Sequence, residues 1–356
     1  MSEILIDYDK NKENYESFAL ALRSLLNTLI RDSKISVHSL NERVKTRKSL
    51  ETKIIKKDKY EKISDITDIV GVRIITHYSD DVDKIANLVE KEFSIDIKNS
   101  IDKRTSMEPD RFGYLSLHYI ASLKSNRTRL REYTSYKGIK FEIQIRSILQ
   151  HAWAEIEHDI GYKSNTGLPT EIRRYFSRLA GLLELADDEF IKIRVGISTR
   201  EQEVAKELAS GSGQSSLDIV ALNEFINKSK MIDEISDDIF KRYGIKTQGR
   251  AENNRVENIL NGLEFIKINT IKDLNNLLSK NSALVVKRMS AFSDNFFNFY
   301  SGRSIPRDSI ISYICQIEVA LANSRKLEIE YVHEAQLKLT KTKILDFFGN
   351  IRSAIK

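Results

Sequence analysis

Four separate segments of the chain carry charged and polar side chains at spacings that suit phosphate chemistry. In the first, Lys45, Ser49 and Lys53 stand four residues apart, and Arg43 comes just before them. On a helix this spacing places the two lysines and the hydroxyl on one face, where they could grip a triphosphate. Lysine acts there as a point charge and arginine as a planar fork. Taken alone, the pattern is better explained by a solvated basic helix face.

The second segment places Asp68 at the start of an apolar run and Arg73 inside it. A carboxylate at a strand end is a common magnesium ligand beside nucleotides. The alternative for Asp68 is an acid in a turn, whereas an arginine within an apolar strand needs a partner for its charge. Side chains 68 and 73 point to opposite faces of a regular strand, so Asp68 must precede the strand or a bulge must intervene.

The third segment, RFGYLSLH at residues 111–118, contains Tyr114 directly after a glycine and His118 four residues later. Glycine lets a loop present the ring as a stacking platform for a base. An ordinary loop with a core tyrosine explains this segment equally well.

The fourth segment, FEIQIR at residues 141–146, alternates polar and apolar residues. Glu142, Gln144 and Arg146 therefore share one strand face, and the apolar residues face the core. An acid, an amide and a cation on one face suit a phosphate–metal site, while a solvent-exposed sheet face is the alternative. In the helix that follows, His151, Glu155 and His158 lie on one face and have the residue types of a zinc site. We favour a structural role for them, as hydrogen-bonding residues that support the sheet, over zinc binding.

A sheet and its helices must bring these segments together. Runs of β-branched and alternating residues predict strands at 69–75, 117–123 and 139–146. Apolar periodicity predicts helices over 11–57, 80–93 and, with a break at 161–169, over 147–208. Beyond the best linker candidate, GSGQSS at 211–216, nearly everything is predicted to be helical, at 217–228, 232–243, 256–266, 271–278, 284–300, 309–322 and 327–348.

The length of 356 residues favours two domains. We predict an α+β domain over 1–210, built on a mixed β-sheet with flanking helices, followed by an all-α domain over 217–356. The crowded aromatic residues between positions 292 and 300 are better explained as core than as an exposed partner surface.

Composition narrows the class of protein. The net charge is +6, from 57 basic and 51 acidic residues, which suits a phosphate-rich ligand without implying nucleic acid. No apolar run reaches the length of a membrane span and the first residues lack a signal core, so we expect a cytoplasmic protein. The single cysteine, Cys315, excludes an intramolecular disulfide and argues against a thiolate metal site.

Together, and in this order, the four segments resemble the synthetase domain of the RelA/SpoT family over about residues 35–195. The resemblance implies a nucleotidyltransferase-like fold and a Mg²⁺-dependent pyrophosphokinase. It would transfer pyrophosphate from ATP to the 3′-hydroxyl of a guanosine nucleotide, GTP or GDP, and so make the alarmone (p)ppGpp of the stringent response. Only about 40 residues precede the matched region, so the hydrolase activity of longer members is not expected.

The resemblance also implies a role for individual residues. The positions that match ATP-binding residues are Arg43, Lys45, Ser49, Lys53 and Arg73. The acids that match magnesium ligands are Asp68 and Glu142, and Glu142 also matches the presumed base for the acceptor hydroxyl. The positions that match the acceptor site are Tyr114, whose ring would stack on the base, His118, Gln144 and Arg146.

Two other functions compete with alarmone synthesis. Leu115 stands where many family members carry Arg or Lys, which weakens the choice of GTP or GDP as the acceptor. A close rival is a toxin-like relative that uses the same chemistry to pyrophosphorylate the 3′ end of tRNA or an adenosine nucleotide. Residues 217–356 would then be a fused inhibitor, of the toxin–antitoxin kind, that responds to a phage protein. A non-catalytic nucleotide sensor would be expected to lack Asp68 or Glu142, and both are present. A homo-oligomer built through the helical region is compatible with each reading.

Overall fold

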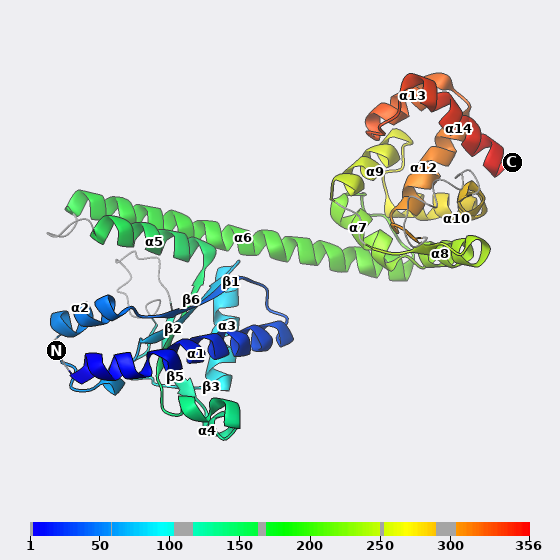
Figure 1. Cartoon of the computed structure of the whole chain (residues 1–356). Helices are drawn as coiled ribbons and strands as arrows, with labels where there is room; N and C mark the ends of the chain where they lie inside the picture. Colours follow the sequence, from blue (N-terminus) through cyan, green and yellow to red (C-terminus); the bar gives the residue numbers. More distant parts are fainter. Residues whose placement is uncertain (1–2, 58, 103–116, 163–168, 250–252, 290–303) are drawn as a thin grey trace. The chain divides into compact units, whose positions relative to one another are not determined.

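The chain divides into two compact units, Met1–Arg194 and Val195–Lys356. The computed structural model describes residues 3–57, 59–102, 117–162, 169–249, 253–289 and 304–356 (Figure 1). The boundary between the units lies inside one helix, α6 (Thr170–Ser210). Tyr114, which the sequence predicts to be presented by a loop, and the aromatic residues between 292 and 300 fall outside the described residues.

The first unit is built on one mixed sheet. Its strands are β1 (Val37–Val44), β2 (Val70–Thr76), β3 (Phe93–Ile95), β4 (Ile101–Asp102), β5 (Leu117–Leu123) and β6 (Phe141–Ser147). The strand order is β1-β2-β6-β5-β3, with β4 also paired to β5. The pair β2–β6 is parallel and the other pairs are antiparallel.

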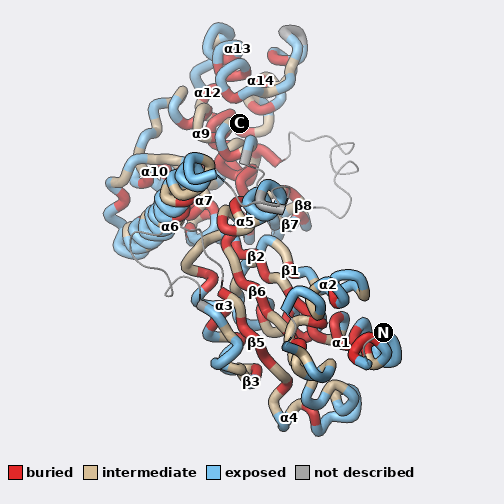
Figure 2. The backbone as a smooth tube through the Cα atoms, turned by 90° about the vertical axis from the view of Figure 1, so that its left-hand side faces the viewer, coloured by how far each residue is buried: buried red, intermediate tan, exposed pale blue. Residues whose placement is uncertain are grey.

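Helices surround this sheet. They are α1 (Glu3–Asp32), α2 (Arg47–Lys57), α3 (Ser79–Glu92), α4 (Ser125–Thr128), α5 (Ile148–Tyr162) and the first part of α6, with short 3₁₀ turns η1 (Ile63–Asp65) and η2 (Arg131–Tyr136). The apolar stripes of α1 and α3 join the sheet in one core, in which Phe18 and Ile85 meet Val72 and Ile143 (Figure 1). In Figure 2 the central strands β2, β5 and β6 are largely buried. This architecture confirms the predicted α+β class with flanking helices.

One sequence prediction about this unit is wrong. Residues 11–57 are not a single helix, because Val37–Val44 form the edge strand β1, which pairs antiparallel with β2. Leu40 is buried while its neighbours are exposed or half-buried, the alternation of a strand. The apolar periodicity of α1 ends at Ile30, and the preference for a strand over 37–44 is fixed by pairing with β2 rather than by local propensity.

The second unit is helical, as predicted, apart from a two-stranded parallel pair, β7 (Lys246–Thr247) and β8 (Ser304–Ile305). Its helices are the end of α6, α7 (Ile219–Lys228), α8 (Lys230–Tyr243), α9 (Asn253–Phe265), α10 (Ile271–Arg288), α12 (Ser309–Ala322), α13 (Arg325–Glu334) and α14 (Lys341–Ile355). They share one apolar core that contains Val204, Phe225, Ile314 and Phe348. None of the described helices is long and apolar enough to cross a membrane.

Two helix boundaries in this unit differ from the prediction. The helix that begins at Ile271 continues to Arg288, so it covers the start of the predicted 284–300 helix. The predicted last helix, 327–348, is two helices, α13 and α14, separated at 335–340. Gln336 adopts a left-handed backbone, with φ of 49°, which stops the helix there. Local periodicity did not show this break because both segments keep an apolar face.

Candidate active site

The strand register places the predicted polar residues in two neighbouring rows on one face of the sheet. Arg43 of β1 pairs with Gly71 of β2, which pairs with Glu142 of β6. Two residues further along these strands, a second row runs through Asn41, Arg73, Gln144 and, on β5, His118. Since side chains alternate along a strand, both rows lie on the face opposite the apolar core. Four strands, β1, β2, β5 and β6, thus build one polar surface.

Glu142 is the centre of this surface. Its Oε1 lies 3.0 Å from Nδ1 of His118, and its Oε2 accepts hydrogen bonds from Gln144 at 2.8 Å and Arg43 at 3.3 Å. Burial by itself raises the pKa of Glu142, but His118, Gln144 and Arg43 outweigh it and lower the pKa to about 2. The side chain is only 14% exposed. Glu142 is therefore a largely buried carboxylate that is ionised at neutral pH.

Asp68 forms a second cluster with two lysines. Its carboxylate lies 2.6 Å from Nζ of Lys53 and 3.1 Å from Nζ of Lys45. Burial raises the pKa of Asp68, but the two lysines outweigh it, so the pKa lies below its usual value. Asp68 sits in a turn before β2 begins at Val70. The expectation that it precedes the regular strand is confirmed.

The predicted helical face formed by Lys45, Ser49 and Lys53 is partly wrong. Ser49 and Lys53 lie on α2, but Lys45 precedes that helix and its backbone N–H donates to the carbonyl of Ile69 at 2.8 Å. Lys45 still meets Lys53, because both bind Asp68. The hydroxyl of Ser49 is exposed and accepts a hydrogen bond from Thr46 at 2.9 Å. The two lysines are thus brought together by their common partner Asp68, and not by a shared helix face as the spacing predicted.

The far end of the polar surface is cationic. Arg73 pairs with Glu155 of α5 at 3.0 Å, and Nδ1 of His151 lies 3.6 Å from the same carboxylate. Among the described residues, the buried Nε of Arg146 has no hydrogen-bond partner. Burial, and next the charge of Arg73, lower the pKa values of both Arg146 and His151. Neighbouring positive charges in a partly buried place favour an anionic ligand such as a phosphate.

The polar surface contains a cavity of about 160 Å³. The residues that line it are Asn41, Glu42, Arg43, Gly71, Val72, Arg73, Glu142, Gln144 and His151. Sequence reasoning missed Asn41 and Glu42, because it placed them in a helix. A Cβ on Gly71 would lie 3.2 Å from Nε of Arg43, so the glycine leaves room for the arginine to cross β2. Tyr114, predicted to stack on the acceptor base, lies outside the described residues.

The donor atoms suit a hard cation held together with a phosphate ligand. Asp68 and Glu142 supply carboxylate oxygens, which magnesium prefers, and Mg²⁺ usually takes only one or two carboxylates from a protein. Over the described part of the chain, no three His, Cys, Asp or Glu side chains gather where they could hold a metal ion. The fold and the site together define a surface for a phosphate-rich ligand, with acids and cations paired across a mixed sheet.

The region that contains the site is similar to known proteins. The family described as "Region found in RelA / SpoT proteins" matches residues 42–167. The GTP pyrophosphokinase YwaC of Bacillus subtilis is 30% identical over 162 residues, which cover 44% of this chain and 74% of the relative. The GTP pyrophosphokinase YjbM of the same organism is 27% identical over 135 residues, which cover 37% of this chain and 59% of the relative.

The crystal structure of small alarmone synthetase 1 from B. subtilis aligns with a TM-score of 0.46 at 23% identity, over 54% of this chain and 98% of that one. The chain belongs to the RelA/SpoT family of pyrophosphokinases. The matched region contains the Asp68 cluster and both polar rows except Asn41.

Proposed function

We propose that this protein transfers pyrophosphate from ATP to the 3′-hydroxyl of GTP or GDP. The observation that carries the proposal is the pairing of Glu142 with Arg43 and His118 on one sheet face, beside the Asp68–lysine cluster. Two curated relatives are named GTP pyrophosphokinases. The shared region includes all of the residues to which a role is assigned below.

The proposed donor site consists of the cations near the Asp68 cluster. Lys45 and Lys53 both bind Asp68, and we propose that they turn to the triphosphate when ATP binds. Ser49 would bind the phosphates from the start of α2, while Arg43 and Arg73 would flank the adenine. The half-exposed side chain of Arg43 can move without unpacking the core.

Asp68 and Glu142 would hold Mg²⁺, which, when bound, neutralises charge on the reacting phosphates. A carboxylate with a pKa of about 2 is a good metal ligand because no proton competes for it at neutral pH. As a base for the 3′-hydroxyl, Glu142 accepts the proton only when the hydroxyl oxygen has begun to bond to phosphorus. That oxygen attacks the β-phosphorus in line and AMP leaves.

The proposed acceptor site lies around the second row. Gln144, His118 and Arg146 would bind the acceptor and its phosphates, and Tyr114 would stack on the base. The buried Nε of Arg146 and the neighbouring charge of Arg73 support a phosphate at this position. Neutralising the phosphate charge is not sufficient for transfer. The base of the acceptor must also stack, so that its 3′-hydroxyl is aligned with the β-phosphorus.

The test is a transfer assay on the full chain with ATP labelled at the γ-phosphate, magnesium, and GTP, GDP, ATP or total tRNA as separate acceptors. Label on GTP or GDP supports the proposal. Label on tRNA or on an adenosine nucleotide replaces it with the toxin-like activity on the same site. Binding of ATP without transfer to any acceptor replaces it either with the nucleotide-sensor function or with an enzyme that residues 217–356 inhibit, and transfer by residues 1–210 alone identifies the second.

A further inference from the structure

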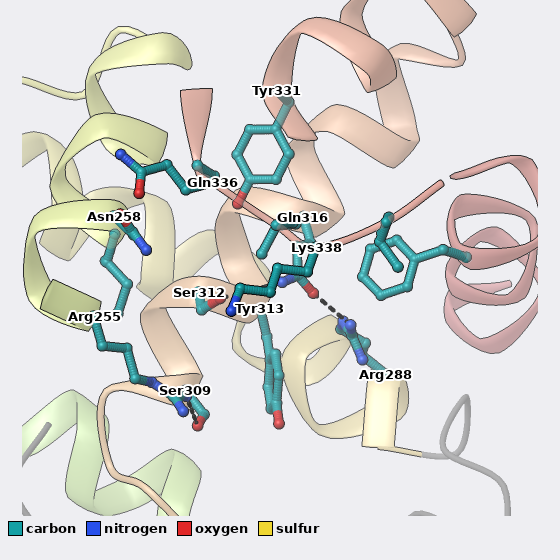
Figure 3. Close-up of a pocket in the computed structure, with 15 residues that line it drawn as sticks. Arg255, Asn258, Arg288, Ser309, Ser312, Tyr313, Gln316, Tyr331, Gln336 and Lys338 are labelled. Atoms are coloured by element: carbon teal, nitrogen blue, oxygen red, sulfur yellow. Dashed lines mark hydrogen bonds between the residues drawn. The ribbon is translucent and has the colours of Figure 1, made fainter. Parts of the chain in front are cut away.

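The helical unit contains a cavity of about 350 Å³ that is separate from the site on the sheet. It lies between α9, α12, α13 and α14, with the end of α10 and the segment 335–340 at its edge (Figure 3). This volume is in the range of small-molecule sites. None of the fifteen described residues that line it belongs to the four segments that carry the synthetase resemblance.

The charge of the lining is one-sided. Among the fifteen described lining residues, Arg255, Arg288 and Lys338 are cationic and none is acidic. Arg255 is neutralised from behind by the fully buried carboxylate of Asp308 and also donates to the hydroxyl of Ser309. The cavity is thus electropositive, and a small anion would be attracted to it.

Arg288 is the most unusual of these cations because it is only 2% exposed. Its guanidinium lies 4.5 Å from the ring centre of Tyr313 and donates a hydrogen bond to Gln316 (Figure 3). Burial lowers the pKa of Arg288 to about 10, so it remains charged at neutral pH. Arg288 thus places a buried positive charge at the edge of the cavity.

The third cation, Lys338, is exposed and comes from the segment between α13 and α14. In Figure 3 its side chain points into the group of labelled residues rather than away from it. The remaining lining is mixed: the amides of Asn258 and Gln336 lie on one side, and leucines 337 and 339 add apolar surface. An amide both donates and accepts hydrogen bonds, which is how Asn and Gln recognise the edge of a base.

We propose that this cavity binds a nucleoside phosphate, with its phosphate held by the cations and its base by the amides. The absence of an acidic side chain among the described lining residues means that this binding needs no magnesium. The proposal does not rest on the transfer reaction, because it concerns a different unit and different residues. If the transfer assay failed for every acceptor, the cavity would still be expected to bind.

The experiment is a calorimetric titration of the full chain in EDTA with AMP and GMP, and separately with inorganic phosphate and the two unphosphorylated nucleosides. Binding of a monophosphate that is at least tenfold tighter than that of phosphate or nucleoside alone is expected. Binding of phosphate alone with equal affinity, or no binding of either nucleotide, would overturn the proposal.

Variants locate the binding. Lys338→Gln removes an exposed charge, so it is not expected to unfold the unit, and the dissociation constant should rise about tenfold. Lys338→Arg should restore affinity, and Asn258→Ala should weaken binding of nucleotide but not of phosphate. The matched control is Lys326→Gln, at a lysine that is 83% exposed on α13 and not part of the lining. Equal affinity in wild type, Lys338→Gln and Asn258→Ala would show that the nucleotide binds elsewhere and would refute the assignment.

Discussion

The charged groups of the two proposed sites are arranged in opposite ways. On the sheet, each central carboxylate is held by cations: Asp68 by Lys45 and Lys53, and Glu142 by Arg43. In the helical cavity, the described lining has three cations and no acid. Paired acids and cations can separate when a metal and a phosphate arrive together, whereas a lining with cations and no described acid can receive an anion without a metal. The difference predicts that only the first site depends on magnesium.

Removal of magnesium therefore gives the largest expected contrast. In EDTA, we expect pyrophosphate transfer to fall to background, while the affinity of the cavity for AMP or GMP changes less than about twofold, because the described lining of the sheet site contains carboxylates and that of the helical cavity does not. Transfer is followed with labelled ATP and affinity by calorimetry. Transfer that persists in EDTA would exclude Asp68 and Glu142 as metal ligands, and lost cavity binding would remove the contrast between the sites.

Glu142→Gln tests the centre of the sheet site. The amide keeps the shape but removes the base and one metal-ligand charge, so we expect kcat to fall by about 10²- to 10⁴-fold. The matched control is Glu132→Gln, on the exposed face of η2, which should retain full activity. Nucleotide binding in the helical cavity should be unchanged in both variants. A Glu142→Gln protein with wild-type kcat would show that another group accepts the proton.

The same carboxylate makes a pH-dependent contribution to stability. The pKa of Glu142 in the folded protein, about 2, is below its ordinary value of 4.5. Its stabilisation is therefore complete above about pH 4.5 and is lost as the pH falls towards 2. The difference in free energy of unfolding between wild type and Glu142→Gln should shrink by about 2 kcal/mol between pH 7 and pH 3. Urea denaturation measures it, and a difference that stays constant with pH would contradict the paired geometry.

Gly71→Ala has the smallest expected effect on the sheet site. The new Cβ would lie 3.2 Å from Nε and 3.4 Å from Cγ of Arg43, so the flexible arginine must shift by a few tenths of an ångström. We expect KM for ATP to rise about threefold with little change in kcat, because the contacts of Arg43 with adenine would weaken equally in the ground state and in the transition state. Gly196→Ala is the control, since a Cβ there meets nothing within 4 Å. An unchanged KM would mean that Arg43 does not contact ATP.

Much of the fold was predictable because its signals are local. The alternation around Glu142, Gln144 and Arg146 identified β6 and the face on which its polar residues lie, and apolar periodicity identified most helices. Strand β1 was missed because an exposed edge strand with one buried residue, Leu40, carries a weak pattern. The residues Asn41 and Glu42 were lost from the predicted site for the same reason. Because Val37, Leu40 and Val44 are three and four residues apart, the apolar pattern of this segment is that of a helix, and a search for alternation would not have found the strand.

The sequence by itself determined which residue types are present for chemistry and, for β6, on which strand face they lie. Only the tertiary structure decided their partners. Arg43 and Glu142 are 99 residues apart, and their contact follows from the register of three strands. The cavity around Arg288 has no sequence signal, because its lining comes from helices whose packing is set by apolar residues elsewhere. Local patterns fix the direction of side chains, but pairing across elements depends on long-range packing that no short window of sequence contains.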